Sequence, residues 1–218
     1  MKFSESLLNL LFPPKCPFCK KVQDSVGICA ACDKELPWIR EQDILLERSG
    51  ELCCAAPLWY EKQVREALLE LKFGGRAAVA EALGETVARC AAEQFSGAFD
   101  VVTWVPISQK RRKERGYDQS DLLARSICRR WDTRPVAMLK KSVDTPPQSG
   151  IEDAAARRAN VLGVYEAVNA EMIQKRRILL VDDIFTTGAT MAECVRVLKE
   201  AGAESVVCVA AARTRRKH

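Results

Sequence analysis

The sequence predicts an α/β fold in which a mostly parallel β-sheet is flanked by helices, preceded by a small cysteine-rich module. From about residue 55 onward, short apolar segments alternate with segments of helical spacing, which is typical of a parallel sheet covered on both faces. Before that point, two Cys-x-x-Cys pairs lie in a segment without this alternation. The 218 residues suffice for one domain of ordinary size with an appendage, and we place the division between residues 1–54 and 55–218.

Apolar spacing assigns the elements of the first half of the α/β region. Residues 55–60 are expected to form a strand. Apolar residues three or four positions apart predict helices over 64–73 and 77–93, with Gly74-Gly75 between them. Residues 99–107 are rich in β-branched side chains and end near a proline, so we expect a second strand there.

The second half continues the alternation. A helix is predicted over 121–131 and a short strand over 136–139. A polar stretch that begins at Thr145 has no steady period and is interpreted as a flexible loop. A final apolar strand is expected over 205–212, followed by a basic tail over 213–217.

Composition argues against several classes of function. The single histidine, His218, is the last residue, which disfavours Ser-His and Cys-His catalysis, and no Gly-Lys-Ser/Thr triplet supports a P-loop. No apolar run approaches the roughly 20 residues that span a bilayer. Residues 1–12 lack a cleavage signal and are expected to form a short amphipathic helix, so we expect a cytoplasmic protein without membrane insertion. The net charge of +5 indicates no polyanionic partner by itself.

Four cysteines indicate a structural Zn²⁺ site. Cys16, Cys19, Cys29 and Cys32 form two CxxC pairs with nine residues between them, and each pair presents two thiolates from one tight turn. Disulfides are the alternative, which the expected cytoplasmic location disfavours. Four thiolates leave no open coordination position, so the zinc is expected to hold structure and not to catalyse.

The other six cysteines are interpreted differently. Cys53 and Cys54 are adjacent in sequence and cannot ligate a metal with CxxC geometry, so we expect them to stand outside the metal site. The remaining four fall within apolar helix or strand patterns and are expected to be small core residues. These are Cys90, Cys128, Cys194 and Cys208.

One strand-loop-helix segment carries most of the functional information. Ile178 to Val181 is a short apolar run typical of a buried strand, and Asp182 and Asp183 follow it. The acids are therefore expected at the carboxyl end of the strand, where open α/β sheets bind ligands. A small hydroxyl-rich loop comes next, and a helix is predicted over about 191–201, stopping at Gly202.

The loop after the two acids suits a phosphate. It offers backbone N–H groups, the positive end of a helix and three threonine hydroxyls. Adjacent carboxylates suit a sugar diol, directly or through a metal, so the two features together describe a ribose 5-phosphate site. The alternative is an ordinary turn whose acids cap the helix, but capping explains neither both acids nor all the hydroxyls. The candidate phosphate-binding residues are Thr186, Thr187, Gly188, Ala189 and Thr190.

This segment resembles the phosphoribosyl pyrophosphate (PRPP) signature of type I phosphoribosyltransferases. The shared pattern is a run of apolar residues, two acids, two further residues and Thr-Thr-Gly-x-Thr. The segment 71–76, Leu-Lys-Phe-Gly-Gly-Arg, resembles the pyrophosphate loop of these enzymes, where close approach of the chain to the diphosphate favours glycine. A helix C-cap with a solvated lysine is the alternative for that segment. The resemblance implies a type I phosphoribosyltransferase-like fold.

A longer series of motifs is similar to the ComF family and covers the chain from about Leu10 to Arg213. The motifs are the two CxxC pairs, Leu-Lys-Phe-Gly-Gly, Val-Pro with a basic run and Arg-Gly-Tyr-Asp-Gln, Pro-Pro-Gln-Ser-Gly, Arg-Arg-x-Asn-Val-x-Gly and the PRPP signature. Two features depart from the family. Tyr117 and Asp118 stand where Phe and Asn are common, which adds a negative charge near the site. Many members also carry further CxxC pairs, and their absence here implies one zinc.

The resemblance implies that PRPP binds together with Mg²⁺. Asp182 and Asp183 would hold the ribose, and the threonine loop would hold the 5-phosphate. Lys72, Gly74 and Gly75 would hold the diphosphate, and Mg²⁺ would neutralise the charge that grows on this leaving group.

An arginine would complete the charge clamp on the diphosphate. The candidates are Arg115 and, from the loop over 141–160, Arg157 or Arg158. The candidate catalytic residues are therefore the two acids and Arg115. The sequence does not identify the acceptor of the phosphoribosyl group, so catalysis itself is left open.

The same resemblance keeps a second class of function open. The ComF family is associated with competence, the uptake of transforming DNA, and no settled reaction comes with it. The protein would then sense PRPP or a nucleotide without catalysis, or handle single-stranded DNA together with competence proteins. The basic runs 110–115 and 213–217 would meet DNA phosphates, although a solvated surface is the alternative for both. We expect the basic tail to lie away from the 186–190 loop.

Overall fold

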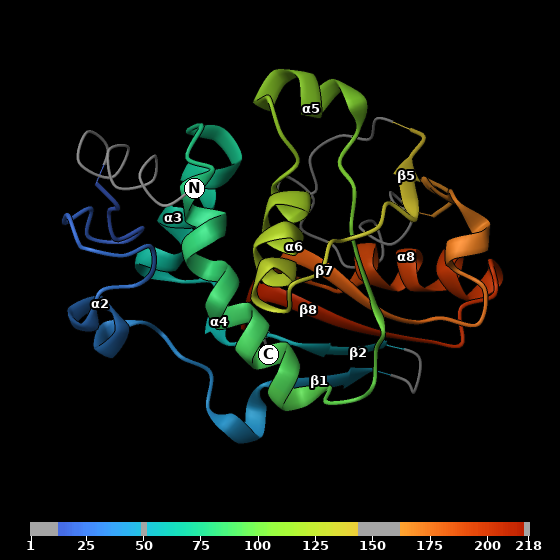
Figure 1. Cartoon of the computed structure of the whole chain (residues 1–218), viewed down its shortest axis with the longest axis horizontal. Coiled ribbons are helices and arrows are strands. Elements are labelled where there is room, and N and C mark those ends of the chain that lie inside the picture. Colours follow the sequence, from blue (N-terminus) through green and yellow to red (C-terminus); the bar gives the residue numbers. More distant parts are fainter. Residues whose placement is uncertain (1–12, 49–51, 144–161, 216–218) are drawn as a thin grey trace.

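The centre of the molecule is a pair of long parallel strands. The computed structural model describes residues 13–48, 52–143 and 162–215. Strands β7 (Arg177–Phe185) and β8 (Ser205–Arg213) pair in parallel along nearly their whole length. In the described part of the chain the main sheet has six strands in the order β1-β2-β8-β7-β4, and β3 pairs with the end of β8 (Figure 1).

All pairs in this sheet are parallel except the one at its edge, where β1 runs antiparallel to β2. A separate two-stranded antiparallel sheet consists of β5 and β6. The bounds of these strands are β1 (Leu45–Arg48), β2 (Leu52–Ala55), β3 (Leu58–Trp59), β4 (Val101–Trp104), β5 (Leu139–Lys141) and β6 (Tyr165–Ala167).

Helices cover both faces of the main sheet, as the alternation of elements predicts. Leu179 and Val181 pack into the core beneath α3, α4 and α6, whereas Ile178 and Leu180 pack beneath α8. All four side chains are fully buried, which is why this stretch is apolar without alternation. The helices are α3 (Lys62–Phe73), α4 (Ala78–Gln94), α6 (Gln119–Arg130) and α8 (Ala189–Glu200).

The N-terminal module lies beside α3 (Figure 1). It contains α2 (Ala30–Glu35) and is followed by a 3-10 turn, Glu41–Asp43. Backbone hydrogen bonds join it to the sheet, including Trp59 N to Pro37 O at 2.8 Å. β1 and β2 already belong to the main sheet, so a division after residue 54 would pass through β2. We propose that the module ends before Leu45.

Most elements agree with the sequence prediction, including the three helices of the first face, within about two residues at each end. The expected strand over 55–60 is only partly present: Ala55 is the last residue of β2, the chain is interrupted near Pro57, and Leu58–Trp59 form the short strand β3. The prediction of a strand over 136–139 is wrong. Val136 donates its N–H to Val102 O at 2.8 Å, and the strand begins only at Leu139, in the separate sheet.

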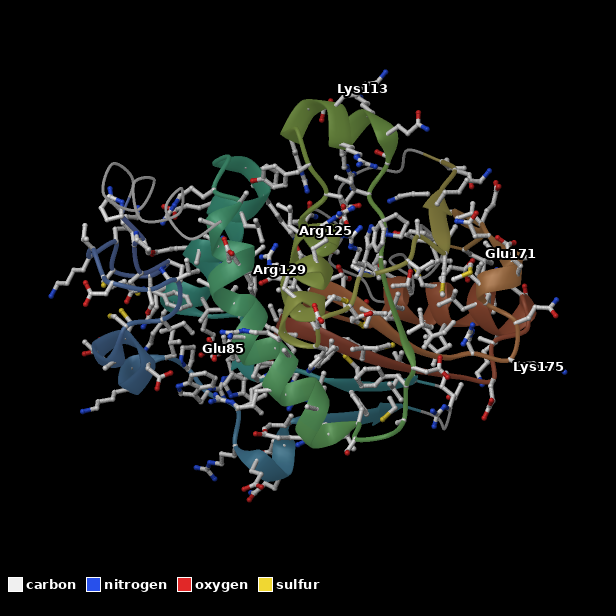
Figure 2. All side chains as sticks on the ribbon, viewed as in Figure 1. Glu85, Lys113, Arg125, Arg129, Glu171 and Lys175 are labelled. Atoms are coloured by element: carbon white, nitrogen blue, oxygen red, sulfur yellow. The ribbon has the colours of Figure 1, made fainter. Side chains whose placement is uncertain are left out.

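The basic run after β4 forms a helix, α5 (Gln109–Arg115). The Ser108 side chain caps its N-terminus, and Gly116 ends it with a φ of 80°, a conformation that favours glycine. Lys113 on this helix projects away from the body of the protein (Figure 2). A second 3-10 turn spans Ala170–Met172.

Three sequence-based expectations lie outside the described residues: the amphipathic helix over 1–12, most of the loop that begins near Thr145, and the end of the basic tail. Among the helices that are described, none has the length and apolar character needed to cross a membrane.

The contact between α4 and α6 yields a test of the fold. A Cβ atom at Gly84 would lie 2.0 Å from Ser126 Oγ and 2.5 Å from Ser126 Cβ. Gly84→Ala should therefore destabilise the protein by about 1–3 kcal/mol, although helix propensity alone would favour alanine by about 1 kcal/mol. Urea denaturation measures the sign. Arg89→Ala, an exposed position on the same helix, serves as the control, and a stabilised Gly84→Ala protein would contradict the packing.

Candidate functional site

The two acids of the signature lie inside β7 and not after it. β7 continues through Asp182 and Asp183 to Phe185, and Asp182 is still in register with Ala210 of β8. The expected strand over 178–181 is therefore too short. The acids nevertheless lie within the last four residues of the strand, at the carboxyl edge of the sheet where ligands of such folds bind.

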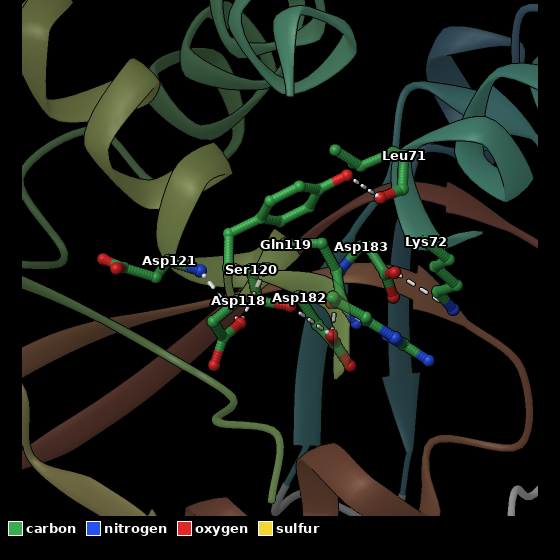
Figure 3. A network of polar contacts seen from close by, with 10 residues as sticks. Leu71, Lys72, Asp118, Gln119, Ser120, Asp121, Asp182 and Asp183 are labelled. Atoms are coloured by element: carbon green, nitrogen blue, oxygen red, sulfur yellow. Dashed lines mark hydrogen bonds and ion pairs between the residues drawn. The ribbon is translucent and has the colours of Figure 1, made fainter. Parts of the chain in front are cut away.

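Asp182 is held by two hydrogen bonds. Its Oδ1 accepts from Ser120 Oγ at 2.9 Å and from Asp183 N at 2.8 Å (Figure 3). Burial, and then the neighbouring Asp183 charge, raise the pKa of Asp182 to about 8. The ligand-free protein therefore favours the protonated form of this carboxyl, compared with an ordinary aspartate.

Asp183 forms an ion pair with Lys72 at the end of α3. Its Oδ2 lies 3.0 Å from Lys72 Nζ, and the residue is only 4% exposed (Figure 3). Burial opposes the charge on the lysine, but the Asp183 carboxylate outweighs this and raises the pKa of Lys72. Within the described residues the buried Oδ2 accepts no well-directed hydrogen bond. This oxygen can still accept a donor or coordinate a cation.

The threonine loop leads directly into α8. Gly188 has a φ of 79°, and a Cβ atom there would lie 2.7 Å from the Phe185 ring, so this position requires glycine. Ala189 N donates to Thr187 Oγ1 at 3.4 Å, and the hydroxyls of Thr186, Thr187 and Thr190 belong to half-buried residues. The loop thus combines the hydroxyls of three half-buried threonines with the N-terminus of a 12-residue helix, a suitable environment for a phosphate.

The glycines of the segment that resembles a pyrophosphate loop end α3. Gly74 is its C-cap and Gly75 has a φ of 67°. The carboxylate of Glu70, one turn earlier, pairs with Arg76 after the glycines and with Lys20 of the N-terminal module. The turn is therefore a helix C-cap, and it also lies beside the acids because Lys72 contacts Asp183.

Arg115 reaches the same region from the end of α5. It donates to Gln119 Oε1 at 3.0 Å and lies 4.9 Å from the centre of the Phe73 ring. Burial, and then the Arg111 charge, lower the pKa of Arg115, while the Asp183 charge acts in the opposite direction. The other two clamp candidates, Arg157 and Arg158, lie outside the described residues.

The departure from the ComF pattern at Asp118 is resolved by helix capping. Asp118 Oδ1 accepts from Ser120 N and Asp121 N, and Oδ2 accepts from Ile107 N at 3.0 Å. Burial raises the pKa of this carboxyl to about 6. The extra acid therefore serves as the N-cap of α6, and the Tyr117 hydroxyl donates to Leu71 O at 2.5 Å.

Ser120 is the site residue that sequence reasoning missed. It is 1% exposed and contacts Asp182 from 62 positions away in the chain. The local signal was its place in the first turn of a helix after a capping aspartate. That signal predicts a helix start and gives no indication of a partner on a distant strand.

The described start of the basic tail, residues 213–215, lies beside the threonine loop, so the expectation that the tail lies away from this loop is wrong for these residues. β7 and β8 are parallel and end at the same edge, and Thr214 N donates to Phe185 O at 3.0 Å. Arg213 is buried as the last residue of β8, and Arg215 pairs with Glu61. Arg213 is therefore unsuited to contact DNA.

The four N-terminal cysteines form one cluster. Their sulfur atoms all lie within 4.8 Å of one another, and Cys19 and Cys29 are 3.6 Å apart. A tetrahedral zinc with Zn–S bonds of about 2.3 Å requires sulfur separations of about 3.8 Å, so the donor set fits. Burial raises the pKa of Cys16, but backbone N–H groups outweigh it and lower the value to about 7. All ten cysteines lie within the described residues, and none forms a disulfide.

Comparison with known protein families gives one match in the α/β domain and one in the N-terminal module. Residues 120–218 match a phosphoribosyl transferase domain, and residues 7–44 match a double zinc ribbon domain. One four-cysteine cluster is present in the part of the module that the structure describes. The solved structure of glutamine PRPP amidotransferase from B. subtilis aligns with 65% of this chain and 30% of that chain, at a TM-score of 0.43 and 23% identity.

Three relatives illustrate the sequence similarity. The competence protein ComFC of Bacillus subtilis (strain 168) is 26% identical over 187 residues, which are 86% of this chain and 72% of that protein. The DNA utilization protein YhgH of Escherichia coli (strain K12) is 30% identical over 155 residues, 67% of this chain and 66% of that protein. The competence protein F of Haemophilus influenzae is 36% identical over 104 residues, 47% of this chain and 45% of that protein.

The sheet, the acid pair with its threonine loop and the four-cysteine cluster define a phosphoribosyltransferase-type domain with an N-terminal zinc ribbon module. Taken with the motifs of the sequence and the relatives, these features identify the family. The chain belongs to the ComF family.

The raised pKa of Asp182 predicts a pH-dependent effect on stability. The folded pKa of about 8 exceeds the unfolded value of about 3.9. The stability contributed by the protonated acid is therefore complete below about pH 4 and is lost as the pH rises toward about 8. Asp182→Asn should remove this loss because asparagine does not ionise. As the pH rises from about 4 to about 8, the free energy of unfolding of the variant should therefore increase relative to the parent, by up to about 1.4 kcal/mol per pH unit.

Urea denaturation of the ligand-free protein at several pH values measures this gain. Asp24→Asn, which makes the same change at an exposed acid of the N-terminal module, is the matched control. A stability difference between Asp182→Asn and the parent that does not vary with pH would contradict the assignment.

Proposed function

We propose that this protein binds PRPP, or a related ribose 5-phosphate ligand, together with Mg²⁺, and transfers the phosphoribosyl group to an acceptor that is still to be identified. The observation that carries the proposal is the Lys72–Asp183 ion pair. It joins two segments that are far apart in the chain and that separately resemble the diphosphate-binding and ribose-binding motifs of phosphoribosyltransferases.

The arrangement of groups supports one orientation of the ligand. The 5-phosphate would lie on the threonine loop at the N-terminus of α8. The ribose diol would donate to Asp182 and Asp183. The diphosphate would then extend toward Lys72 and the glycine turn that follows it, with Arg115 on its other side. In this pose Lys72 would leave the Asp183 carboxylate and pair with a phosphate of the ligand. Asp183 would then interact with the ribose diol or with the metal ion.

The acid pair also fits Mg²⁺. This ion prefers carboxylate oxygens and substrate phosphates, and Asp183 Oδ2 is a buried acceptor without a well-directed hydrogen bond in the described structure. When bound, Mg²⁺ neutralises charge on the diphosphate leaving group. The acids would either hold the ion or accept hydrogen bonds from the ribose hydroxyls.

Ligand binding should depend on the protonation of Asp182. A carboxyl that accepts two diol donors or faces a cation favours its ionised form. With a ligand-free pKa of about 8, Asp182 would release a proton on binding, and affinity would rise with pH up to about that value.

In the proposed transfer, the bond between ribose C1 and the diphosphate oxygen breaks, and its electron pair leaves with the diphosphate. The acceptor forms the new bond at C1 and loses its proton to solvent or to the leaving group. Cations placed where charge grows on the leaving group supply the stabilisation, and the protein supplies position. Reduced thiolates in the zinc module suit a cytoplasmic location, which we also propose.

The double variant Asp182→Ala with Asp183→Ala tests the proposal. Each lost charge-assisted hydrogen bond is worth about 1.5–3 kcal/mol, so affinity for PRPP with Mg²⁺ should fall at least tenfold. Calorimetric titration measures it. The fold should persist because the acids lie within the last four residues of β7 and the apolar part of the strand is intact. Asp24→Ala with Glu66→Ala, which removes two exposed acids elsewhere, is the control. Equal affinity in parent and double variant would exclude this diol site.

A second candidate function is the handling of single-stranded DNA, which the names of the relatives support. The observation that favours it is α5, whose seven residues, Gln109–Arg115, include five cations. Because α5 follows β4, it lies at the same carboxyl edge as the acids (Figure 1). The helix could guide a polyanion toward the site.

Salt dependence separates the two candidates. If α5 contacts DNA, Arg112→Ala with Lys113→Ala should reduce the slope of log affinity against log salt by up to about 1.4, since each phosphate contact contributes about 0.7. PRPP affinity should not change. Lys175→Ala with Arg176→Ala removes two exposed cations at the opposite edge and is the control. An unchanged slope in the α5 variant would remove this helix from consideration as a DNA site.

A further inference from the structure

The end of α3 is held by three separate parts of the chain. From the N-terminal module, Lys20 Nζ lies 2.7 Å from Glu70 Oε1. From the turn before α6, the Tyr117 hydroxyl donates to Leu71 O. From β7, Asp183 pairs with Lys72. Three consecutive residues of α3 are thus each fixed by a different element, immediately before the glycine turn.

The contact from the module originates at the metal cluster itself. Lys20 directly follows Cys19, and its backbone has a φ of 64°, unusual for a lysine. The turn is closed by hydrogen bonds from Lys20 N to Cys16 O at 3.0 Å and from Cys16 N to Lys21 O at 2.9 Å. The direction in which Lys20 leaves the module therefore depends on the conformation that the cysteine pair adopts around the metal.

Glu70 connects Lys20 of the module to the glycine turn. Its carboxylate binds both Lys20 and Arg76, and its carbonyl accepts from Gly74 N at 2.8 Å and Arg76 N at 3.4 Å. The hydrogen bond from Lys20 lowers the pKa of Glu70. Partial burial opposes this effect and Arg76 adds to it, so the acid stays ionised. Both ends of the glycine turn are consequently tied to one residue.

We propose that the zinc module positions the diphosphate-binding turn through Lys20 and Glu70, so that zinc occupancy controls affinity for the diphosphate part of the ligand. This inference rests on the proposed function of the turn. Lys20 and Glu70 are positioning residues that act through the backbone of Lys72, Gly74 and Gly75. The zinc ribbon would then be a structural support of the binding site as well as of its own fold.

The chain offers a well-matched pair of variants. Lys20→Ala removes the contact with Glu70, whereas Lys21→Ala removes a neighbouring exposed lysine. Because Lys20 is an exposed partner, we expect a two- to fivefold loss of affinity for inorganic pyrophosphate with Mg²⁺, the range of about 0.4–1 kcal/mol for such pairs. Lys20→Arg should restore the affinity. Metal analysis should find about one zinc per chain in all three proteins.

A second ligand distinguishes positioning from a general loss of structure. Ribose 5-phosphate carries no diphosphate, so Lys20→Ala should bind it as the parent does. Removal of zinc from the parent by a chelator should weaken pyrophosphate more than ribose 5-phosphate. Equal pyrophosphate affinity of Lys20→Ala and Lys21→Ala, or an equal loss for both ligands, would overturn the inference.

The ligand-free protein provides a readout that does not depend on the proposed function. Amide hydrogen exchange at Gly74 and Arg76, which donate to Glu70 O, should accelerate in Lys20→Ala and on zinc removal, but not in Lys21→Ala. If the parent binds neither ligand, the proposed function fails while faster exchange still supports the linkage. Unchanged exchange on zinc removal would overturn the linkage itself.

Discussion

The parallel pairing of β7 and β8 is the constraint on which the rest of the structure depends. Both faces of β7 are buried, so a shift of one residue would place each apolar side chain under the wrong helices. The same register fixes the acids at the end of the strand. Asp183 lies on the same face as Leu179 and Val181, the face that α3 covers, and this alternation brings it to Lys72. The strand register that packs the core is therefore the same register that positions the acids of the site.

Sequence reasoning recovered the features of this site that are local in the chain. The apolar run, the acids, the glycine with positive φ and the helix after it all follow from neighbours a few residues apart. The CxxC pairs are local in the same sense. The partners of the acids are not, because Ser120 and Lys72 meet β7 only after the whole sheet has formed. Periodicity carries no information about such contacts.

Charge patterns were the least reliable guide, for two opposite reasons. The basic run before Gly116 has no apolar face, so it gave no helical signal, yet Ser108 and Gly116 delimit a helix. Arg213 stands in a similar run but completes a strand, is buried, and lies 4.8 Å from the centre of the Trp59 ring. Runs of cations that look alike in the sequence can therefore lie in very different places: one forms the surface of a helix, and the other begins at the buried end of a strand.

The ligand-free site contains two adjacent acids that the protein can only partly satisfy. Burial and the neighbouring charge raise the pKa of Asp182, and Asp183 relies on a lysine whose geometry leaves its buried oxygen without a directed hydrogen bond. Burying carboxylates in this way is unfavourable unless a partner compensates. A ligand with a diol, a cation and a diphosphate would supply each missing partner, including a new one for Lys72. The unfavourable electrostatics of the empty site therefore favour the bound state of the proposed ligand, since a ligand shifts an equilibrium only through interactions that the free state lacks.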